Sequence, residues 1–381
     1  MNPMFTGACC YNGGMSDQPR MSPSYGAYLR LGTLLAAQDP PDFDNLSPDD
    51  RPSAKTRELA HHDEMLFIVV HQVFELWFKL VLHELGRARD LLGRVNGEAA
   101  VAEEDVPKAA AAIARVNEIL RIAADGFRAM ETMNPTSFLE FRDLLIPSSG
   151  FQSTQFRELE ILAGLPEAVR MDFEGVPYEA KLSATEREIL ARRRGEMSLK
   201  DALFDWLTRT PIERVFPDFA EAFLGAFAAY IDEQVTHQKS NPNLADSQRR
   251  AAEVRFAEQL EEARAYLLGG EAHQNRAHQS FLFIASYRGE PLLRWPASLV
   301  DACIEFEQNF RIFRFRHARM VERMIGTRTG SGGSPGVHYL DRTTSRYRIF
   351  GDLLEARNFL LAAGRCPPIP DDRLLHFRFE E

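Results

Sequence analysis

The chain has 381 residues, 45% of them hydrophobic, and a formal net charge of −10 at pH 7. This length allows one large domain or two ordinary ones, with enough apolar residues for a sizeable core. The acidic balance and the lack of a long basic run argue against a nucleic-acid-binding groove.

The four cysteines form no CxxC or CxxCH motif, so neither a zinc ribbon nor covalently attached haem is expected. So few cysteines, together with no signal peptide, predict a protein of the reducing cytoplasm. The longest apolar run is too short to cross a bilayer, so no membrane partner is expected.

Residues 1–21 are rich in glycine and polar side chains and are predicted to form a flexible tail. Ser22 and Pro23 are typical of an N-cap followed by proline in the first helical turn. The helix that follows carries Tyr25 and Tyr28 on one face, which by itself favours packing over chemistry. Residues 39–57 are predicted to form a loop.

A long periodic segment over residues 59–95 predicts a helix. Phe67, His71, Phe74 and Phe78 fall on one stripe of it, so His71 should point inward. The alternative to a functional role is a core histidine bonded to a neighbouring group. A second helix is predicted over residues 106–130.

Pro135 opens a short helix that contains Phe138 and Arg142. These two residues are four apart and share a face. An arginine beside an aromatic ring suits a planar carboxylate, although the pattern alone favours an intramolecular ion pair. Residues 147–150 predict a tight turn, and another helix should begin at Phe151.

Further helices are predicted over residues 199–207, 216–230, 248–268, 280–287 and 347–361, and residues 186–196 should form a solvated charged face. Trp295 and Pro296 begin a long helix that carries His317. No strand alternation of any length occurs, so the predicted fold class is all-α. The predicted organisation is a single helical domain over residues 22–365, flanked by the N-terminal tail and by a C-terminal tail over residues 366–381.

His317 lies on a helical stripe with aromatic residues before it and methionines after it: Phe306, Phe310, Phe313, Met320 and Met324. Alone, this spacing favours a core histidine bonded to a carbonyl over a metal ligand. A loop with four glycines follows at residues 330–336. Its backbone can approach a ligand closely and its N–H groups can bind an anion, or it can serve as a flexible linker.

Two histidines on two apolar helix faces are a pattern that a buried haem would explain, one ligating iron and the other lining the opposite side. A di-iron carboxylate bundle predicts Glu-x-x-His pairs facing the core. No such pair lies on an apolar stripe, so the sequence disfavours this class of site.

Four long motifs occur in order along the chain: YGAYLRL, HDEMLFIVVHQVFELWFK, ETMNPTSFLEFRDLLIPSSGFQSTQFRELE and HARMVERMIGTRTGSGGSPGVHYL. Through them the chain resembles the tryptophan 2,3-dioxygenase family from Tyr25 to about residue 361, least strongly between residues 163 and 270. The resemblance implies a helical haem b enzyme that is a homotetramer. It also implies the kynurenine-pathway reaction, in which O2 is inserted across the indole C2–C3 bond of L-tryptophan to give N-formyl-L-kynurenine.

By the same resemblance, His317 would be the proximal iron ligand and His71 the distal residue near the indole N–H. Arg142 would hold the substrate carboxylate, and Phe67 and Phe138 would wall the indole pocket.

The resemblance also implies that the Ser331 hydroxyl helps to bind the ammonium and carboxylate end of the substrate. His71, Arg142 and Ser331 would then form the catalytic set. Ser149 and Gly332 would contact the cofactor. Tyr25 and Tyr28 would reach the active site of a neighbouring subunit.

Two residues depart from the family pattern. Ser331 stands where threonine is usual, and Pro335 replaces the usual second serine and stiffens the loop. These changes leave open an alternative, a related haem monooxygenase that forms a 2-oxindole from tryptophan or a substituted tryptophan. Alternatives from other classes are a regulatory protein that binds haem and tryptophan without turnover, and a helical scaffold without haem.

Overall fold

The computed structural model describes residues 24–42, 55–93, 104–146, 148–170, 178–331 and 336–370. The chain divides into two compact units, residues 1–59 and 60–381, each described by itself below. Within the described ranges the secondary structure is helical, with no strand and one isolated bridge between Pro41 and Thr56. The predicted all-α class is confirmed.

The first unit contains two single-turn helices, α1 (Tyr25–Tyr28) and α2 (Leu31–Leu34). They replace the one helix predicted here because Arg30 takes a left-handed conformation (φ 53°) and interrupts it. The Ser24 hydroxyl caps α1 by accepting from the Ala27 N–H. The predicted cap at residues 22–23 lies outside the described residues.

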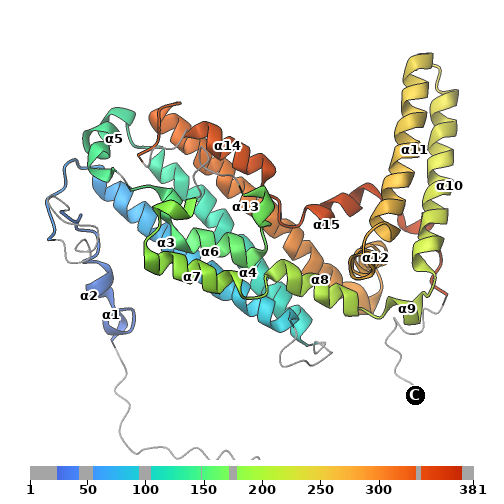
Figure 1. The fold of residues 1–381 in the computed structure, drawn as a ribbon, viewed down its shortest axis with the longest axis horizontal. Helices are drawn as coiled ribbons and strands as arrows, with labels where there is room; N and C mark the ends of the chain where they lie inside the picture. The colour runs from blue at the N-terminus through green and yellow to red at the C-terminus, as the bar shows by residue number, and fades with distance from the viewer. Residues whose placement is uncertain are drawn as a thin grey trace, which may run out of the picture. The chain divides into compact units, whose positions relative to one another are not determined.

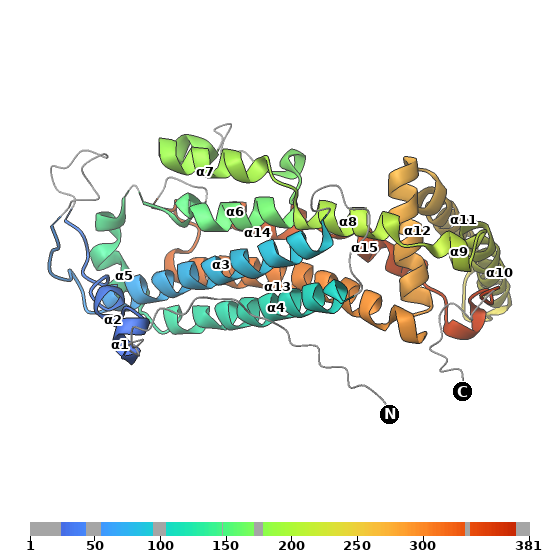
Figure 2. The same ribbon diagram turned by 90° about the horizontal axis from the view of Figure 1, so that it is seen from below.

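Three long helices form the centre of the second unit: α3 (Glu64–Leu92), α4 (Asp105–Met130) and α13 (Arg294–Ile325). Helix α4 packs along both α3 and α13, and Figure 2 shows the three side by side. Each helix buries an apolar stripe with helical spacing, as the sequence predicted. The fully buried side chains include Val81, Leu85, Ile113, Val116, Leu120, Leu299 and Phe306.

Helix α3 is long and apolar enough, by length and composition alone, to cross a membrane. Only 17% of its most apolar window is buried, because one side lines a cavity and Val69, Val73 and Leu76 lie at the surface. It nevertheless packs against α4, α6 (Thr154–Ala163) and α8 (Leu199–Arg209). Packing against three helices is typical of the core helix of a globular protein.

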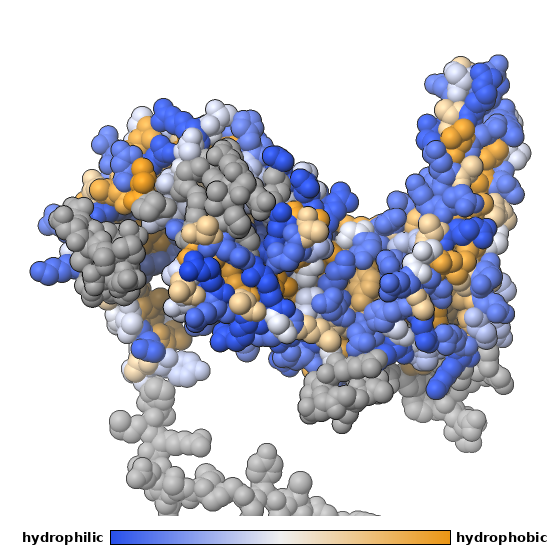
Figure 3. Space-filling model, viewed as in Figure 1, coloured by the Kyte–Doolittle hydropathy of each residue, from blue (hydrophilic) through white to orange (hydrophobic). Residues whose placement is uncertain are grey.

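The other helices of the second unit include α5 (Pro135–Arg142), α7 (Ala184–Arg194), α9 (Ile212–Val215), α10 (Phe219–Ser240), α11 (Asp246–Leu268) and α12 (Ala272–Ser286). Helix α7 packs on α6, whereas α10 and α11 pair with each other next to α12, at one end of the unit (Figure 1). Leu190 is the one fully enclosed residue of α7, so the predicted solvated face of this charged run is confirmed. The face of the molecule in Figure 3 is mostly hydrophilic, with smaller hydrophobic patches between the charged residues.

The prediction of a single helix over residues 347–361 is wrong. The structure has α14 (Val337–Arg346) before this segment and only the short α15 (Gly351–Glu355) within it. The backbone between them turns away because the buried Glu307 carboxylate accepts the N–H groups of Ile349 (2.7 Å) and Phe350 (3.0 Å). These two N–H groups are therefore satisfied without a helix, through a contact distant in sequence.

Candidate active site

A cavity lies in the second unit, between α3, α4, α5, α6, α13 and α14. It holds about 1490 Å³ of empty space, with its open side included. Many of its lining side chains are aromatic, among them Phe67, Phe74, Phe127, Phe138, Phe151, Phe156 and Phe313. The cavity also brings together five of the polar residues that the sequence singled out: His71, Arg142, Ser149, His317 and Ser331.

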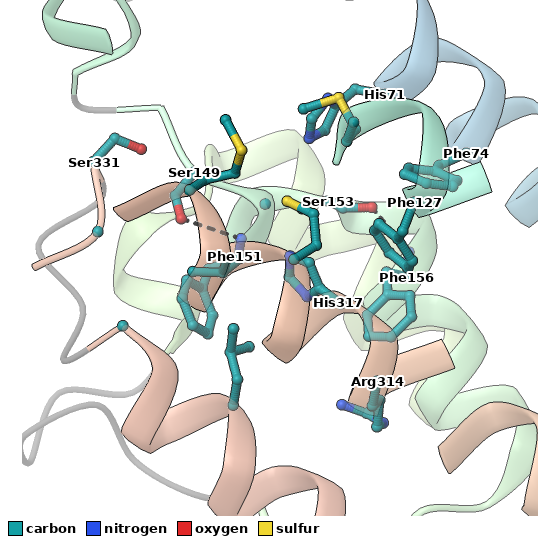
Figure 4. Close-up of a pocket in the computed structure, with 18 of the residues that line it drawn as sticks. His71, Phe74, Phe127, Ser149, Phe151, Ser153, Phe156, Arg314, His317 and Ser331 are labelled. Atoms are coloured by element: carbon teal, nitrogen blue, oxygen red, sulfur yellow. Dashed lines mark hydrogen bonds between the residues drawn. The ribbon is translucent and has the colours of Figure 1, made fainter. Parts of the chain in front are cut away.

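His317 extends from α13 into this cavity, one turn after the buried Phe313 (Figure 4). Its ring stacks on Phe127 with a centroid distance of 5.5 Å and an interplanar angle of 19°. Burial, the nearby ring of His71 and the charge of Arg314 lower the pKa of His317 to about 4. Its imidazole is therefore neutral near pH 7. In the part of the chain that the structure describes, neither ring nitrogen has a hydrogen-bond partner.

His71 lines the same cavity from α3. Its Nδ1 lies 2.7 Å from the carbonyl oxygen of Phe67. A carbonyl can only accept, so Nδ1 must carry the hydrogen, which leaves Nε2 as an acceptor in the neutral ring. Burial lowers the pKa of His71, against the opposing effects of the Phe67 bond and the Glu75 charge. The ring therefore presents a hydrogen-bond acceptor to the cavity.

Aromatic rings from α3 and α5 meet beside His71. The ring centroid of Phe67 is 4.1 Å from that of His71, 5.9 Å from that of Phe138 and 5.8 Å from that of Phe141. Asn134 caps α5 and Pro135 stands at its start, so the sequence itself sets where this helix begins. The result is an aromatic surface next to a single acceptor nitrogen.

Arg142 and Ser331 line the cavity, and each donates a hydrogen bond to a segment distant from it in sequence. Arg142 ends α5, and its guanidinium donates to the carbonyl oxygen of Thr329. The Ser331 hydroxyl donates to the carbonyl oxygen of Ser148 at 2.7 Å. The ion pair from Arg142 to a carboxylate, which the pattern alone favoured, does not occur among the described residues. Its charge is therefore available to an acidic ligand.

Ser149 lies where the predicted tight turn leads into the next helix. Its hydroxyl accepts from the Phe151 N–H at 3.4 Å, and its own N–H donates to Gln152 at 3.0 Å. This reciprocal cap starts the 3₁₀ turn η3 (Gly150–Gln152). The new helix begins at Thr154, three residues after the predicted start at Phe151.

Three predicted site residues are not part of this cavity as described. Tyr25 and Tyr28 belong to the first unit, where they are 77% and 75% exposed. Gly332, the third, lies outside the described residues.

Sequence reasoning missed a buried charged cluster at the cavity wall. Glu160 on α6 is completely enclosed, and Arg157, Arg170 and Arg314 all bind its carboxylate. Burial alone would raise the pKa of Glu160, but these three guanidinium groups lower it to about 2. Arg314 stands three residues before His317, a helical spacing that could have signalled it. Its pairing with Glu160, 154 positions away, leaves no signal in the sequence.

The residues present fit a haem better than a metal held by protein ligands alone. In the described ranges, no group of three or more His, Cys, Asp or Glu side chains could hold a metal ion. The unbonded, neutral imidazole of His317 in a largely apolar cavity could serve as the iron ligand of a haem. Arg157 and Arg314 also line the cavity, and the buried Nε of Arg314 has no acceptor among the described residues.

The family model described as tryptophan 2,3-dioxygenase matches residues 11–360. A tryptophan 2,3-dioxygenase from Sorangium cellulosum is 39% identical over 379 residues, which cover 94% of this chain and 88% of the relative. A protein from Ralstonia nicotianae named tryptophan 2,3-dioxygenase 2 is 38% identical, with coverages of 91% and 95%. The Xenopus laevis tryptophan 2,3-dioxygenase is 34% identical, with coverages of 88% and 82%. The chain therefore belongs to the tryptophan 2,3-dioxygenase family.

Proposed function

We propose that this protein is a haem-dependent oxygenase that inserts O2 across the indole C2–C3 bond of L-tryptophan and releases N-formyl-L-kynurenine. One observation carries the proposal: two neutral histidines, His71 and His317, share one aromatic cavity, and each keeps a ring nitrogen available. Family membership supports oxidation of tryptophan. Both atoms of O2 enter the product, so turnover consumes no external reductant.

His317 would hold the cofactor through the lone pair of its neutral imidazole. When bound, haem b would supply the iron that reacts with O2. Arg314 lines the cavity and binds Glu160, and its buried Nε, which has no acceptor among the described residues, would be the donor to a carboxylate of the cofactor. Ser149 and Gly332 are further proposed contacts.

His71 would orient the indole ring. Its Nε2 is an acceptor because Nδ1 is committed to the Phe67 carbonyl, and the indole N–H is a donor only. Phe67 and Phe138 would lie along the flat faces of the ring and keep water away from the reacting carbons.

Arg142 and Ser331 would bind the amino-acid end of the substrate. Both now donate to neutral carbonyl oxygens, of Thr329 and Ser148, and a carboxylate is the stronger acceptor for a guanidinium. A bidentate pair with Arg142 would fix the indole relative to His71. Such positioning can contribute about 7 kcal/mol or more to lowering a reaction barrier.

We further propose that the enzyme is a cytoplasmic homotetramer of the kynurenine pathway, with residues 22–365 as its oxygenase domain. Tyr25 and Tyr28 of one subunit would then contact the active site of a neighbour. Their strong exposure in the isolated chain supports a partner that covers them.

The test is to reduce the haem-loaded protein anaerobically, add L-tryptophan and isotopically labelled O2, and identify the product by mass spectrometry. A ring-opened product with two labelled atoms is expected. One labelled atom in an intact ring would instead indicate the oxindole-forming monooxygenase. Tryptophan binding with no product would indicate a regulatory protein, and a colourless protein that refuses haemin would indicate a scaffold.

A further inference from the structure

Glu75 is the one acidic side chain among the described residues that line the cavity. It lies on α3 one turn after His71, so both side chains are on the same face of the helix. A carboxylate in a largely apolar wall is costly unless it is bonded, and the proposed chemistry gives Glu75 no direct role.

Both oxygens of this carboxylate bind the start of α6. Oε1 accepts from the Ser153 hydroxyl at 2.6 Å, and Oε2 accepts from the Gln155 amide at 2.8 Å. The same amide also donates to the backbone carbonyl of Glu75 at 2.9 Å. No cation pairs with Glu75 in the described part of the chain, so these uncharged donors are its partners.

Ser153 connects this carboxylate to the cavity wall. Its oxygen also accepts from the Phe156 N–H at 3.2 Å and thereby caps α6. The segment anchored in this way begins at Ser149 and ends at Phe156, and Ser149, Ser153 and Phe156 all line the cavity (Figure 4). The negative charge also lies near the N-terminus of α6, where the helix dipole favours it.

We propose that Glu75 is a positioning residue, whose carboxylate holds residues 149–156 against α3 as a clamp and so sets the shape of the cavity that His317 also lines. This inference rests on the proposed function for its effect on catalysis. In Glu75→Gln, a neutral amide of the same size keeps only one acceptor oxygen. Either the Ser153 hydroxyl or the Gln155 amide then loses its acceptor.

Glu75→Gln tests the clamp, with Glu84→Gln as the matched control. Glu84 lies on the same helix and is buried in an ion pair with Arg115, and it does not line the cavity. The loss of its charge therefore reports the effect of general damage to α3. In the haem-loaded enzyme, kcat for tryptophan should fall roughly 10- to 100-fold in Glu75→Gln, because a shifted cavity lining would displace the substrate from its reactive position. Glu84→Gln should keep kcat within about twofold of the wild type. A kcat for Glu75→Gln within twofold of the wild type would overturn the proposal.

A double-mutant cycle with Ser153→Ala tests whether the carboxylate acts through this hydroxyl. The double variant should lose no more activity than the more impaired of the two single variants, because both changes break the same chain of contacts. A loss equal to the product of the two single losses would contradict the clamp.

Hydrogen exchange separates this inference from the proposed function. Amides of residues 149–156 should exchange faster in Glu75→Gln and stay unchanged in Glu84→Gln. Should the wild type form no N-formyl-L-kynurenine, the proposed function fails, and the exchange rates alone decide the clamp. Unchanged exchange in Glu75→Gln would refute it.

Discussion

The imidazole of His71 donates its Nδ1 hydrogen to the carbonyl oxygen of Phe67, four residues earlier on α3, at 2.7 Å. This bond fixes both the tautomer and the orientation of the ring. The helix thus supplies, from its own backbone, the partner that decides which nitrogen faces the cavity.

We predict that His71→Ala lowers kcat/KM for tryptophan by about 10- to 100-fold, because a buried indole N–H would lose its acceptor at a cost of about 1–3 kcal/mol. The control substrate is 1-methyltryptophan, which has no indole N–H. The binding affinities of both compounds are measured by spectral titration, and the affinity for 1-methyltryptophan should change much less than that for tryptophan. An equal loss of binding affinity for both compounds would argue that His71 acts only by packing.

His317→Ala should lose haem, because this imidazole is the group proposed to hold the iron, and the other histidine of the cavity, His71, has its ring fixed on α3 by the Phe67 carbonyl. The measurement is the Soret absorbance per protein, with circular dichroism to confirm that the helices remain. His338→Ala is the matched control, since His338 lies on α14 and is exposed. Full haem occupancy in His317→Ala would refute the assignment of the ligand.

Arg142→Met should lower kcat/KM for tryptophan, mainly by weakening capture of the substrate. A charge-assisted hydrogen bond is worth about 1.5–3 kcal/mol, which corresponds to a loss of about 10- to 150-fold in capture of the carboxylate. Tryptamine, which lacks the carboxylate, should bind the variant and the wild type equally. A comparable weakening of tryptamine binding would point to collapse of α5 instead of loss of a specific contact.

Stability should fall in acid through Glu160. Its pKa is about 2 in the folded chain and lies near its ordinary value of 4.5 when unfolded. A group with a depressed folded pKa stabilises the fold above its unfolded pKa, and this contribution is lost as the pH falls from about 4.5 towards 2. The contribution amounts to about 3 kcal/mol at neutral pH.

Glu160→Gln should therefore flatten the pH dependence of the unfolding free energy between pH 4.5 and 2. It should also destabilise the protein at pH 7 by about 3–5 kcal/mol, since Arg157 and Arg314 would remain buried without their shared carboxylate. Urea unfolding at a series of pH values measures both effects. A variant that keeps the wild-type slope would exclude Glu160 as the titrating group.

Local sequence predicted the helices of the centre because their signal is periodic. The stripe that carries Phe67, His71 and Phe74 predicted both α3 and the inward direction of His71, and the same reasoning holds for His317 on α13. Helix α14 was not predicted although its ten residues, VHYLDRTTSR, are amphipathic, because the segment is short and directly follows the glycine-rich loop. It takes its place by packing along α13.

What the sequence alone determined is therefore the fold class and the inward faces of the histidines, since both follow from spacing within one helix. Tertiary structure alone decided which distant groups meet: Arg142 with Thr329, Ser331 with Ser148, and Arg314 with Glu160. Each of these contacts spans more than 150 positions, and helical periodicity carries no record of which helix will lie opposite. The polar partners of the cavity depend on how the helices pack, and this packing is set by the whole core at once.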